Sequence, residues 1–293
     1  MKIGYPCINN SIGCTANSTF RLASYSEEKL IEKVSENLKC LMEILRWNKK
    51  KGIYFFRIGS QLVPFASHPI CKFNWQKYFK KEFKEVGGFI KKNKMRISMH
   101  PDQFVVLNSN RKEVLENSLR ELEYHADVLD LFGLDSSAKM QIHVGAAYGD
   151  KENAKKVFIQ RYKKLNKKIR KRLVIENDDR IFSVKDCLEI SEATGISILV
   201  DSFHHELNNN GESIRTAIKL CEKTWDEWDG KIMIDYSSQK KDGRRGSHTE
   251  NIDIRKFKKF LEESKGIKMD IMLEIKNKEK SVLEALKILE NVR

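Results

Sequence analysis

The feature that most constrains the fold is a unit that recurs eight times: a short apolar, β-branched run, a loop, and a segment with apolar residues at helical spacing. The predicted strands are 2–5, 53–58, 95–99, 140–144, 173–175, 197–200, 231–234 and 270–273. The alternating helices are predicted around 31–45 and 79–90, and over 111–132, 151–170, 183–194, 213–224, 253–264 and 280–291. Ser24 and Glu27 have capping-box spacing before the first helix.

Strands that alternate with helices favour a parallel sheet covered by helices, and continuous apolar runs such as ISILV and KIMI are typical of such strands. Eight units predict an α/β fold, a (β/α)8 TIM barrel. The alternative is a doubly wound open sheet, but no G-x-G-x-x-G follows the first strand and no Walker A motif is present. No linker rich in Pro, Gly or Ser divides the chain, so residues 1–293 are predicted to form one barrel domain.

The charge balance points to a polyanionic partner. The chain has 55 Lys and Arg against 41 Asp and Glu, a formal net charge of +14. Such a field attracts nucleic acid, although a Lys-rich solvated surface is the alternative reading. Apolar runs are too short for a signal peptide or a membrane span, and the six cysteines form no C-x-x-C pair, so we expect reduced thiols and a cytoplasmic protein.

Metal-ligand residue types stand at the ends of six successive predicted strands. They are His100, His143, Glu176, Asp201, Asp235 and Glu274. In a TIM barrel the carboxyl ends of the strands meet at the face that carries the active site. Four carboxylates at one barrel mouth would repel one another unless cations compensate them, so bound divalent metals are expected. Mixed imidazole and carboxylate ligands suit Mn, Zn or Fe.

The other histidines divide into two groups. His204, in DSFHH, and His248, in the loop after the seventh strand, can reach a third ion. His68 is a minor site candidate, whereas His125 and His205 are assigned no function.

Several longer motifs carry a resemblance. They are KIGYPCIN, FRIGSQLVPFASHP, ISMHPDQF, IENDD, DSFHHELN and SHTENID. In this order and at these distances they resemble the UV damage endonuclease family over essentially the whole chain. The resemblance implies a barrel related to sugar isomerases and apurinic-site endonucleases. It also implies an enzyme that nicks DNA immediately 5′ of a lesion, leaving 3′-hydroxyl and 5′-phosphate ends, with up to three divalent ions, commonly manganese.

The family's site residues carry over motif by motif. His100, His143 and Glu176 would act in catalysis and hold one ion. Glu176 would bridge to a second ion, held also by Asp201, Asp235 and Glu274, while His204 and His248 would hold a third. Gln103 and Phe104 would form a wedge into the duplex, and Tyr5 and Asn9 would line the lesion pocket.

The seventh strand departs from the family pattern. The family usually has K-x-H-x-S there, with a carboxylated lysine and a metal-binding histidine, where this chain has Met233 and Asp235. Methionine cannot carry the carboxyl group, and an aspartate makes the site harder and more anionic. Manganese is therefore the expected ion, with zinc and magnesium as alternatives, and the number of ions is left at two or three.

The resulting hypothesis is a DNA repair endonuclease that acts on double-stranded DNA containing UV photoproducts, with the lesion flipped out of the duplex. It would be nucleoid-associated when acting on DNA, with no membrane and no obligate protein partner. A sugar isomerase or epimerase of the same barrel class is one alternative, and a non-catalytic DNA-binding barrel is another.

Overall fold

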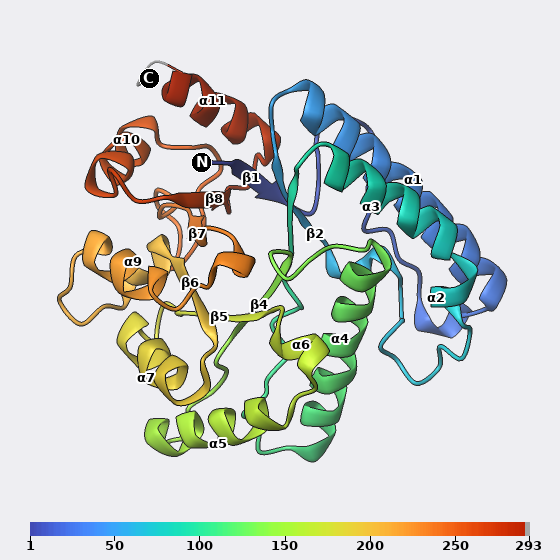
Figure 1. Ribbon diagram of the computed structural model, residues 1–293, viewed down its shortest axis with the longest axis horizontal. Coiled ribbons are helices and arrows are strands. Elements are labelled where there is room, and N and C mark those ends of the chain that lie inside the picture. The colour runs from blue at the N-terminus through green and yellow to red at the C-terminus, as the bar shows by residue number, and fades with distance from the viewer. Residues whose placement is uncertain (291–293) are drawn as a thin grey trace.

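The computed structural model describes residues 1–290, and within them eight parallel strands close into a barrel in sequence order (Figure 1). The strands are β1 (Ile3–Pro6), β2 (Phe55–Ile58), β3 (Arg96–Met99), β4 (Lys139–His143), β5 (Leu173–Glu176), β6 (Ser197–Asp201), β7 (Ile232–Tyr236) and β8 (Met269–Leu273). Each predicted strand overlaps an observed one, and the (β/α)8 barrel is confirmed.

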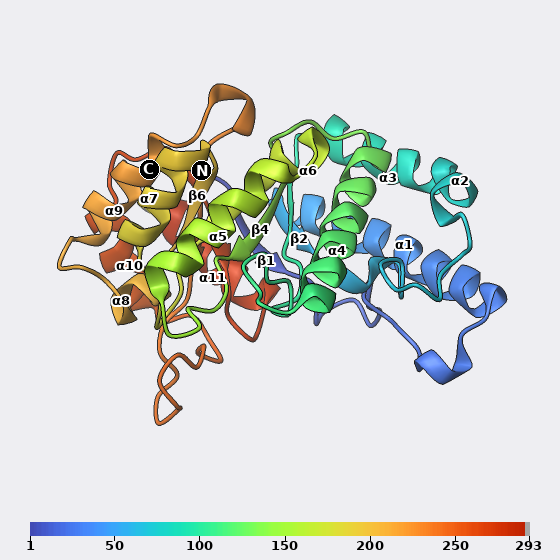
Figure 2. The same ribbon diagram turned by 90° about the horizontal axis from the view of Figure 1, so that it is seen from below.

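Helices surround the barrel in both views (Figures 1 and 2). The longer ones are α1 (Glu27–Lys50), α3 (Lys80–Lys92), α4 (Lys112–Leu131), α5 (Lys151–Lys164), α7 (Val184–Thr194), α9 (Ile214–Glu222), α10 (Ile254–Glu263) and α11 (Glu279–Glu290). Shorter ones are α2 (Trp75–Tyr78), α6 (Lys167–Arg170) and α8 (Ser202–Leu207), with 3-10 turns η1 (Leu22–Ser24), η2 (Ser60–Leu62) and η3 (Glu227–Asp229). None of the helices in the described residues combines the length and apolar character needed to cross a membrane.

Two helix predictions need correction. The cap of α1 is Ser26, whose side chain accepts from the Lys29 amide, while Ser24 belongs to the preceding 3-10 turn. The predicted helix 151–170 is split, because Leu165 has an extended backbone and Asn166 caps α6 by accepting from the Ile169 amide. The predicted end of the last helix at residue 291 lies outside the described residues.

The period of two along each strand separates two environments. Outward residues such as Ile3, Phe56 and Ile97 belong to the main core beneath the helices. Inward residues form a separate apolar layer across the middle of the barrel: Phe55, Val174, Leu199, Met233 and Met272. Gly4 on β1 leaves no space for a side chain, since a Cβ there would lie 2.2 Å from the Phe55 carbonyl oxygen.

Inward-facing charges at the starts of the strands lie below this layer, and they are paired. Arg96 Nη1 donates to Asp270 Oδ2 at 2.9 Å, and Lys139 Nζ lies 2.5 Å from Asp229 Oδ1. Both cations also face the ring of Trp225, at 5.5 and 5.8 Å. The amino-terminal end of the barrel therefore contains buried charges of both signs in contact with one another.

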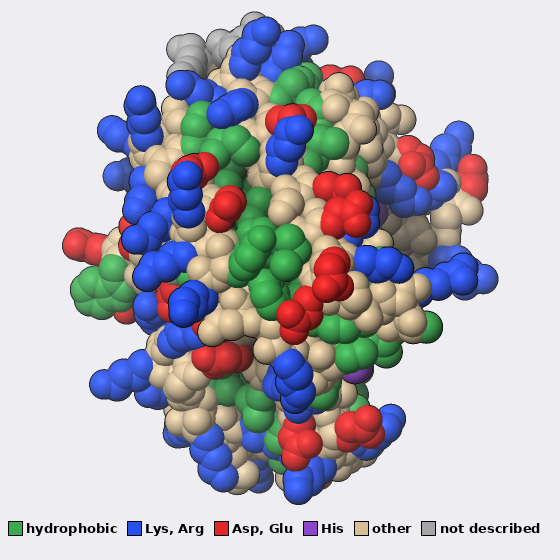
Figure 3. Space-filling view, turned by 90° about the vertical axis from the view of Figure 1, so that its right-hand side faces the viewer, with side chains coloured by type: hydrophobic (Ala, Val, Ile, Leu, Met, Phe, Trp, Pro, Cys, Tyr) green, Lys and Arg blue, Asp and Glu red, His purple; other side chains and the backbone are tan. Residues whose placement is uncertain are grey.

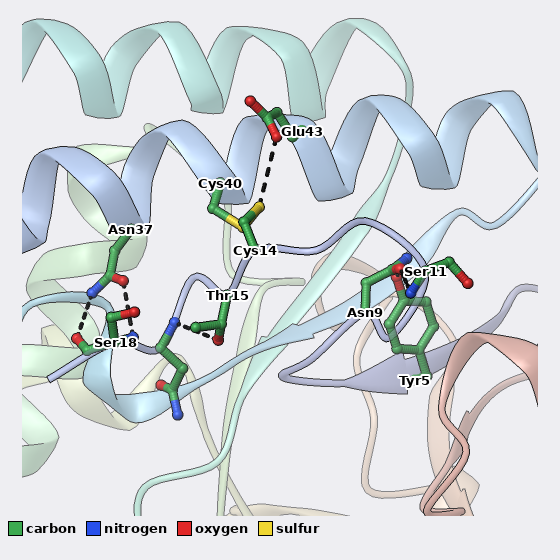
Figure 4. The surroundings of a disulfide bond; sticks show 10 residues. Tyr5, Asn9, Ser11, Cys14, Thr15, Ser18, Asn37, Cys40 and Glu43 are labelled. Atoms are coloured by element: carbon green, nitrogen blue, oxygen red, sulfur yellow. Dashed lines mark hydrogen bonds between the residues drawn. A yellow bond between two sulfur atoms is a disulfide. The ribbon is translucent and has the colours of Figure 1, made fainter.

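The prediction that all six cysteines are reduced is wrong for two of them. Cys14, in the loop after β1, and Cys40, in α1, form a disulfide (Figure 4). The remaining cysteines, Cys7, Cys71, Cys187 and Cys221, are free. The long loop between β1 and α1 lies along α1 and brings the pair together, so no local spacing motif announces it.

Candidate metal centre at the barrel mouth

The carboxyl ends of the strands bring all six predicted strand-end residues into the barrel mouth. With His204 they form three overlapping groups, and in each group one ligand atom per residue lies within 4.8 Å of the others. The groups are His100, His143 and Glu176; Glu176, Asp201 and His204; and Asp201, Asp235 and Glu274. Shared members make the three groups one continuous cluster.

Glu176 lies between the two imidazoles of the first group and that of His204. Its Oε2 is 3.5 Å from His100 Nε2, and its Oε1 is 3.5 Å from His204 Nδ1. His100 Nδ1 lies 2.8 Å from the Pro101 carbonyl oxygen, an outer contact that directs Nε2 toward Glu176. Burial lowers the pKa of His143, whose Nδ1 is buried without a hydrogen-bond partner. A neutral imidazole with an unpaired nitrogen is suited to binding a metal.

Asp201 starts α8 and so fixes the second group. Its Oδ1 accepts from the amides of Phe203 and His204 at 2.7 and 2.8 Å, whereas its Oδ2 is buried without a partner. His204 Nδ1 lies 3.6 Å from that Oδ2. Burial opposes protonation of His204, but Asp201 and Glu176 outweigh it and raise the pKa of His204 to about 11. The short turn from β6 into α8 thus places both side chains at the mouth.

Arg57 and Gln141 connect the carboxylates of the third group to Glu176, and neither was predicted as a site residue. Arg57 Nη2 lies 2.5 Å from Asp235 Oδ2 and donates to Gln141 Oε1 at 2.8 Å, and Nη1 pairs with Glu274. Gln141 Nε2 donates to Glu176 Oε2 at 2.8 Å and to Asp235 Oδ2 at 2.7 Å. Both residues occupy inward positions on their strands. The alternation of side chains along β2 and β4 could therefore have indicated that they face the interior of the barrel.

The mouth holds four carboxylates against two cationic groups, Arg57 and His204. Three of these carboxylates, Asp235, Glu274 and Glu176, act on Arg57. Burial and neighbouring carboxylates raise the pKa of Asp235 well above its usual value, although Arg57 acts in the other direction. Burial and neighbouring carboxylates also raise the pKa of Asp201 to about 6, against the effect of His204. Asp235 Oδ1 and Asp201 Oδ2 are buried without hydrogen-bond partners. Unpaired acceptors of this kind, beside an unpaired imidazole nitrogen, fit divalent cations.

His248 reaches the edge of this cluster from the loop between β7 and α10. Its Nδ1 lies 2.7 Å from the Glu274 carbonyl oxygen and its Nε2 3.9 Å from Glu274 Oε2, and its ring centroid is 6.4 Å from that of His204. Among the described residues, none of the metal-sized groups includes His248. The structure therefore brings His248 near His204 without completing a third histidine-based group.

A cavity of about 640 Å³ lies over the cluster. Its lining includes Arg57, His100, His143, Gln103, Phe104, His248, Glu274, Lys276 and Lys278. Phe104 projects from the loop after β3 and is 62% exposed. Tyr148, in the loop after β4, is 50% exposed and has a left-handed backbone, and it is not among the residues that line the cavity. The mouth thus combines carboxylates that could bind metal ions at its floor with exposed aromatic and basic residues around it.

Tyr5 and Asn9 lie inside the wall and are not among the residues that line the cavity. The Tyr5 hydroxyl donates to Asn48 Oδ1 at 2.6 Å and accepts from Asn9 Nδ2 at 2.7 Å, and both residues are buried. Pro6 and Cys7, which follow Tyr5, do line the cavity. Tyr5 and Asn9 therefore lie behind the residues that line the cavity.

The remaining histidines lie in other contacts. His125 is fully buried, with Nδ1 2.8 Å from the Glu121 carbonyl oxygen, and burial lowers its pKa to about 4. His205 faces Glu212, and His68 Nδ1 accepts from the Ile70 amide. Met233 packs in the apolar layer, one inward position below Asp235.

Comparisons with known proteins agree with the motif pattern. The family model described as UV-endonuclease UvdE matches residues 1–293. A UV DNA damage endonuclease of Clostridium perfringens is 40% identical over all of this chain and 71% of its own length, and one of Bacillus thuringiensis is 33% identical over all of this chain and 96% of its own. The crystal structure of SacUVDE has a TM-score of 0.95 at 48% identity and covers 100% of this chain and 99% of its own.

More distant structures share the fold. Endonuclease IV from Thermus thermophilus has a TM-score of 0.59 at 13% identity, covering 86% of this chain and 95% of its own. A D-psicose 3-epimerase from Clostridium cellulolyticum has a TM-score of 0.53 at 13% identity, covering 80% of this chain and 79% of its own. At these identities the likeness extends to the barrel alone.

Proposed function

Because the chain belongs to the UV-endonuclease UvdE family and is thereby a DNA repair endonuclease, we propose that it nicks duplex DNA immediately 5′ of UV photoproducts with two to three divalent ions bound at the barrel mouth. The observation that carries the proposal is the set of unpaired buried donors there: His143 Nδ1, Asp201 Oδ2 and Asp235 Oδ1. Manganese is the ion we expect from this mixed donor set.

The ligands divide between the overlapping groups. His100, His143 and Glu176 would hold one ion, and Glu176 would bridge to a second beside Asp201 and His204. Bound ions of this kind activate water as a nucleophile and offset charge on the attacking and leaving oxygens of a phosphodiester. Gln141, by donating to Glu176 and Asp235, keeps these two carboxylates at fixed positions under the cavity.

Residues at the edge of the cavity would recognise the lesion. Damaged bases stack poorly, so extruding them from the duplex costs less than extruding normal bases. Phe104 and Gln103 would fill the gap left in the duplex, and the extruded nucleotides would enter the cavity that these residues line. Tyr5 and Asn9 would contribute indirectly, by fixing the strand end that carries Pro6 and Cys7.

The positive charge supports binding along the DNA backbone. Lys276 and Lys278 line the cavity, and the loop between β7 and α10, which carries Lys240, Arg244 and Arg245, extends away from the barrel (Figure 2). Lys and Arg side chains also spread over much of the face in Figure 3, interspersed with acidic ones. Phosphate contacts from such residues position a duplex without reading its sequence.

Two alternatives are disfavoured by particular observations. A sugar isomerase or epimerase shares the barrel, but it has no use for an exposed Phe104 or a net charge of +14. A non-catalytic DNA-binding barrel would keep the basic surface, but it would have no need for four carboxylates in one mouth.

The test is a panel of duplexes, each carrying one defined lesion at one position, incubated with the protein and Mn²⁺. We expect a single nick immediately 5′ of each photoproduct, with a 3′-hydroxyl end that a polymerase extends. Nicks scattered along undamaged DNA, or no nick at any photoproduct, would contradict the proposal. Turnover of ketoses or aldoses by the same preparation would favour the isomerase instead.

A further inference from the structure

We propose that Arg57 is a built-in cation that takes the place of one divalent ion, so that the mouth binds two ions and not three. The inference rests on the proposed function and concerns the corner of the mouth formed by Asp235 and Glu274. These are the two acidic residues that the sequence resemblance assigned to an ion together with Asp201.

Arg57 is fixed where an ion would otherwise bind. It occupies an inward position of β2, is only 2% exposed, and its guanidinium contacts Asp235 with Nη2 and Glu274 with Nη1. Gln141 Oε1 accepts a further hydrogen bond from Nη2. A guanidinium stays protonated in proteins, and its fork of donors matches carboxylates well. The charge of Arg57 is therefore permanent, buried and directed at both acids.

This contact engages two of the three carboxylates of the third group, at one oxygen each. One oxygen each of Asp235 and Glu274 is engaged by Arg57, and an ion bound to the same oxygens would lie against a like charge in a buried site. The neighbouring inward position offers no replacement ligand, because Met233 packs among Phe55, Val174 and other apolar side chains. The second oxygens, Asp235 Oδ1 and Glu274 Oε2, remain in this corner, and an ion bound to them would also lie beside the guanidinium.

The other two groups keep their donors. His100, His143 and Glu176 form one, Glu176, Asp201 and His204 form the other, and Glu176 belongs to both. The unpaired atoms His143 Nδ1 and Asp201 Oδ2 lie in different groups. Two divalent ions bridged by Glu176, together with Arg57, would more than neutralise the four carboxylates, whereas a third would leave a large excess of positive charge.

The test counts ions directly. The metal-free full-length protein is loaded with Mn²⁺, and the ions retained per chain are counted by native mass spectrometry. We expect two in the wild-type protein, two in Arg57→Lys, which keeps the charge, and three in Arg57→Gln, which frees Asp235 and Glu274. The matched control is Arg96→Gln, at the inward position of β3 where Arg96 pairs with Asp270 at the opposite end of the barrel, and it should retain two.

Three ions in the wild-type protein, or two in a folded Arg57→Gln variant, would overturn the proposal. If Arg57→Gln does not fold, the wild-type count still decides the matter. Nicking of photoproduct DNA is measured in parallel on the wild-type protein: nicking with three ions would refute the role of Arg57 alone, and two ions without nicking would refute the proposed function alone.

Discussion

The two ends of the barrel treat buried charge in opposite ways. At the amino-terminal end, Arg96 and Lys139 each contact an aspartate, and Asp270 additionally accepts from the Lys2 amide at 2.7 Å. At the carboxyl end, several carboxylates share one arginine, and buried acceptor atoms of Asp201 and Asp235 have no partner. The same strands carry both arrangements, separated by one apolar layer.

The difference separates a structural charge cluster from a functional one. A buried ion pair is sustained by its own geometry, and breaking it leaves an uncompensated charge. A cluster with excess charge of one sign needs counter-ions that the chain does not provide. Here the imidazole and carboxylate ligands fit divalent cations. We therefore expect changes at the lower end to affect stability and changes at the mouth to affect the reaction.

The largest effect should come from Glu176→Gln. The amide cannot replace a bridging carboxylate between two ions, so we expect the nicking rate to fall by about a thousandfold or more. Single-turnover kinetics on a duplex with one photoproduct measure the loss, and a circular dichroism spectrum checks the fold. Near-wild-type nicking by a folded variant would end the assignment of Glu176 as a ligand.

Asp270→Asn should have the opposite profile. It leaves Arg96 buried without its charged partner, which costs about 3 to 5 kcal/mol in the free energy of unfolding. Urea denaturation measures this cost, while the nicking rate per folded molecule should stay at the wild-type value. A thousandfold loss of nicking without loss of stability would mean that the two ends are not separable.

The double variant Gln103→Ala with Phe104→Ala should affect recognition at the rim. Filling the space of extruded bases is worth about 1 to 3 kcal/mol per stacked group, whereas phosphate contacts set the salt dependence of binding. Binding titrations at several salt concentrations should give an unchanged slope with weaker preference for damaged DNA. The variant should still nick a substrate whose lesion is already unstacked. Equal losses on damaged, undamaged and unstacked DNA would remove the wedge assignment.

The smallest effect should come from His204→Ala. His204 belongs to one group of possible ligands, and its loss leaves the group of His100, His143 and Glu176 complete, so we expect the nicking rate to fall by about tenfold, no less than the loss of an outer partner of a ligand costs. Raising the Mn²⁺ concentration should recover part of it. A defect that is insensitive to Mn²⁺ would indicate that His204 does not bind a metal.

The barrel and its strand-end site residues could be predicted from the sequence, because the order of the strands and the alternation of side chains along them determine both. The strand-end residues from His100 to Glu274 converge because parallel strands end at one face, and a strand-end position can be read from a short apolar run. Site residues and pairings that depend on contacts between distant segments could not be predicted from the sequence. Arg57 and Gln141 become part of the site only through the closure of the barrel, and Cys14 meets Cys40 only because a long loop lies along α1.

Two features on the outside of the barrel also could not be predicted from the sequence. Tyr5 was expected to line a pocket, but period two along β1 turns its side chain outward, beneath α1, where it contacts Asn48. The break between α5 and α6 depends on the extended backbone of Leu165, which apolar spacing alone does not reveal.

The dependence of nicking on bound metal is tested by removing the metal and returning it. The wild-type protein is stripped with a chelator, dialysed, and assayed for nicking of a duplex with one photoproduct before and after addition of Mn²⁺, with thermal melting recorded in both states. We predict no nicking by the folded, metal-free protein and restored nicking 5′ of the lesion with Mn²⁺. Full nicking by the folded protein, with its metal content verified as zero, would contradict metal-dependent nicking.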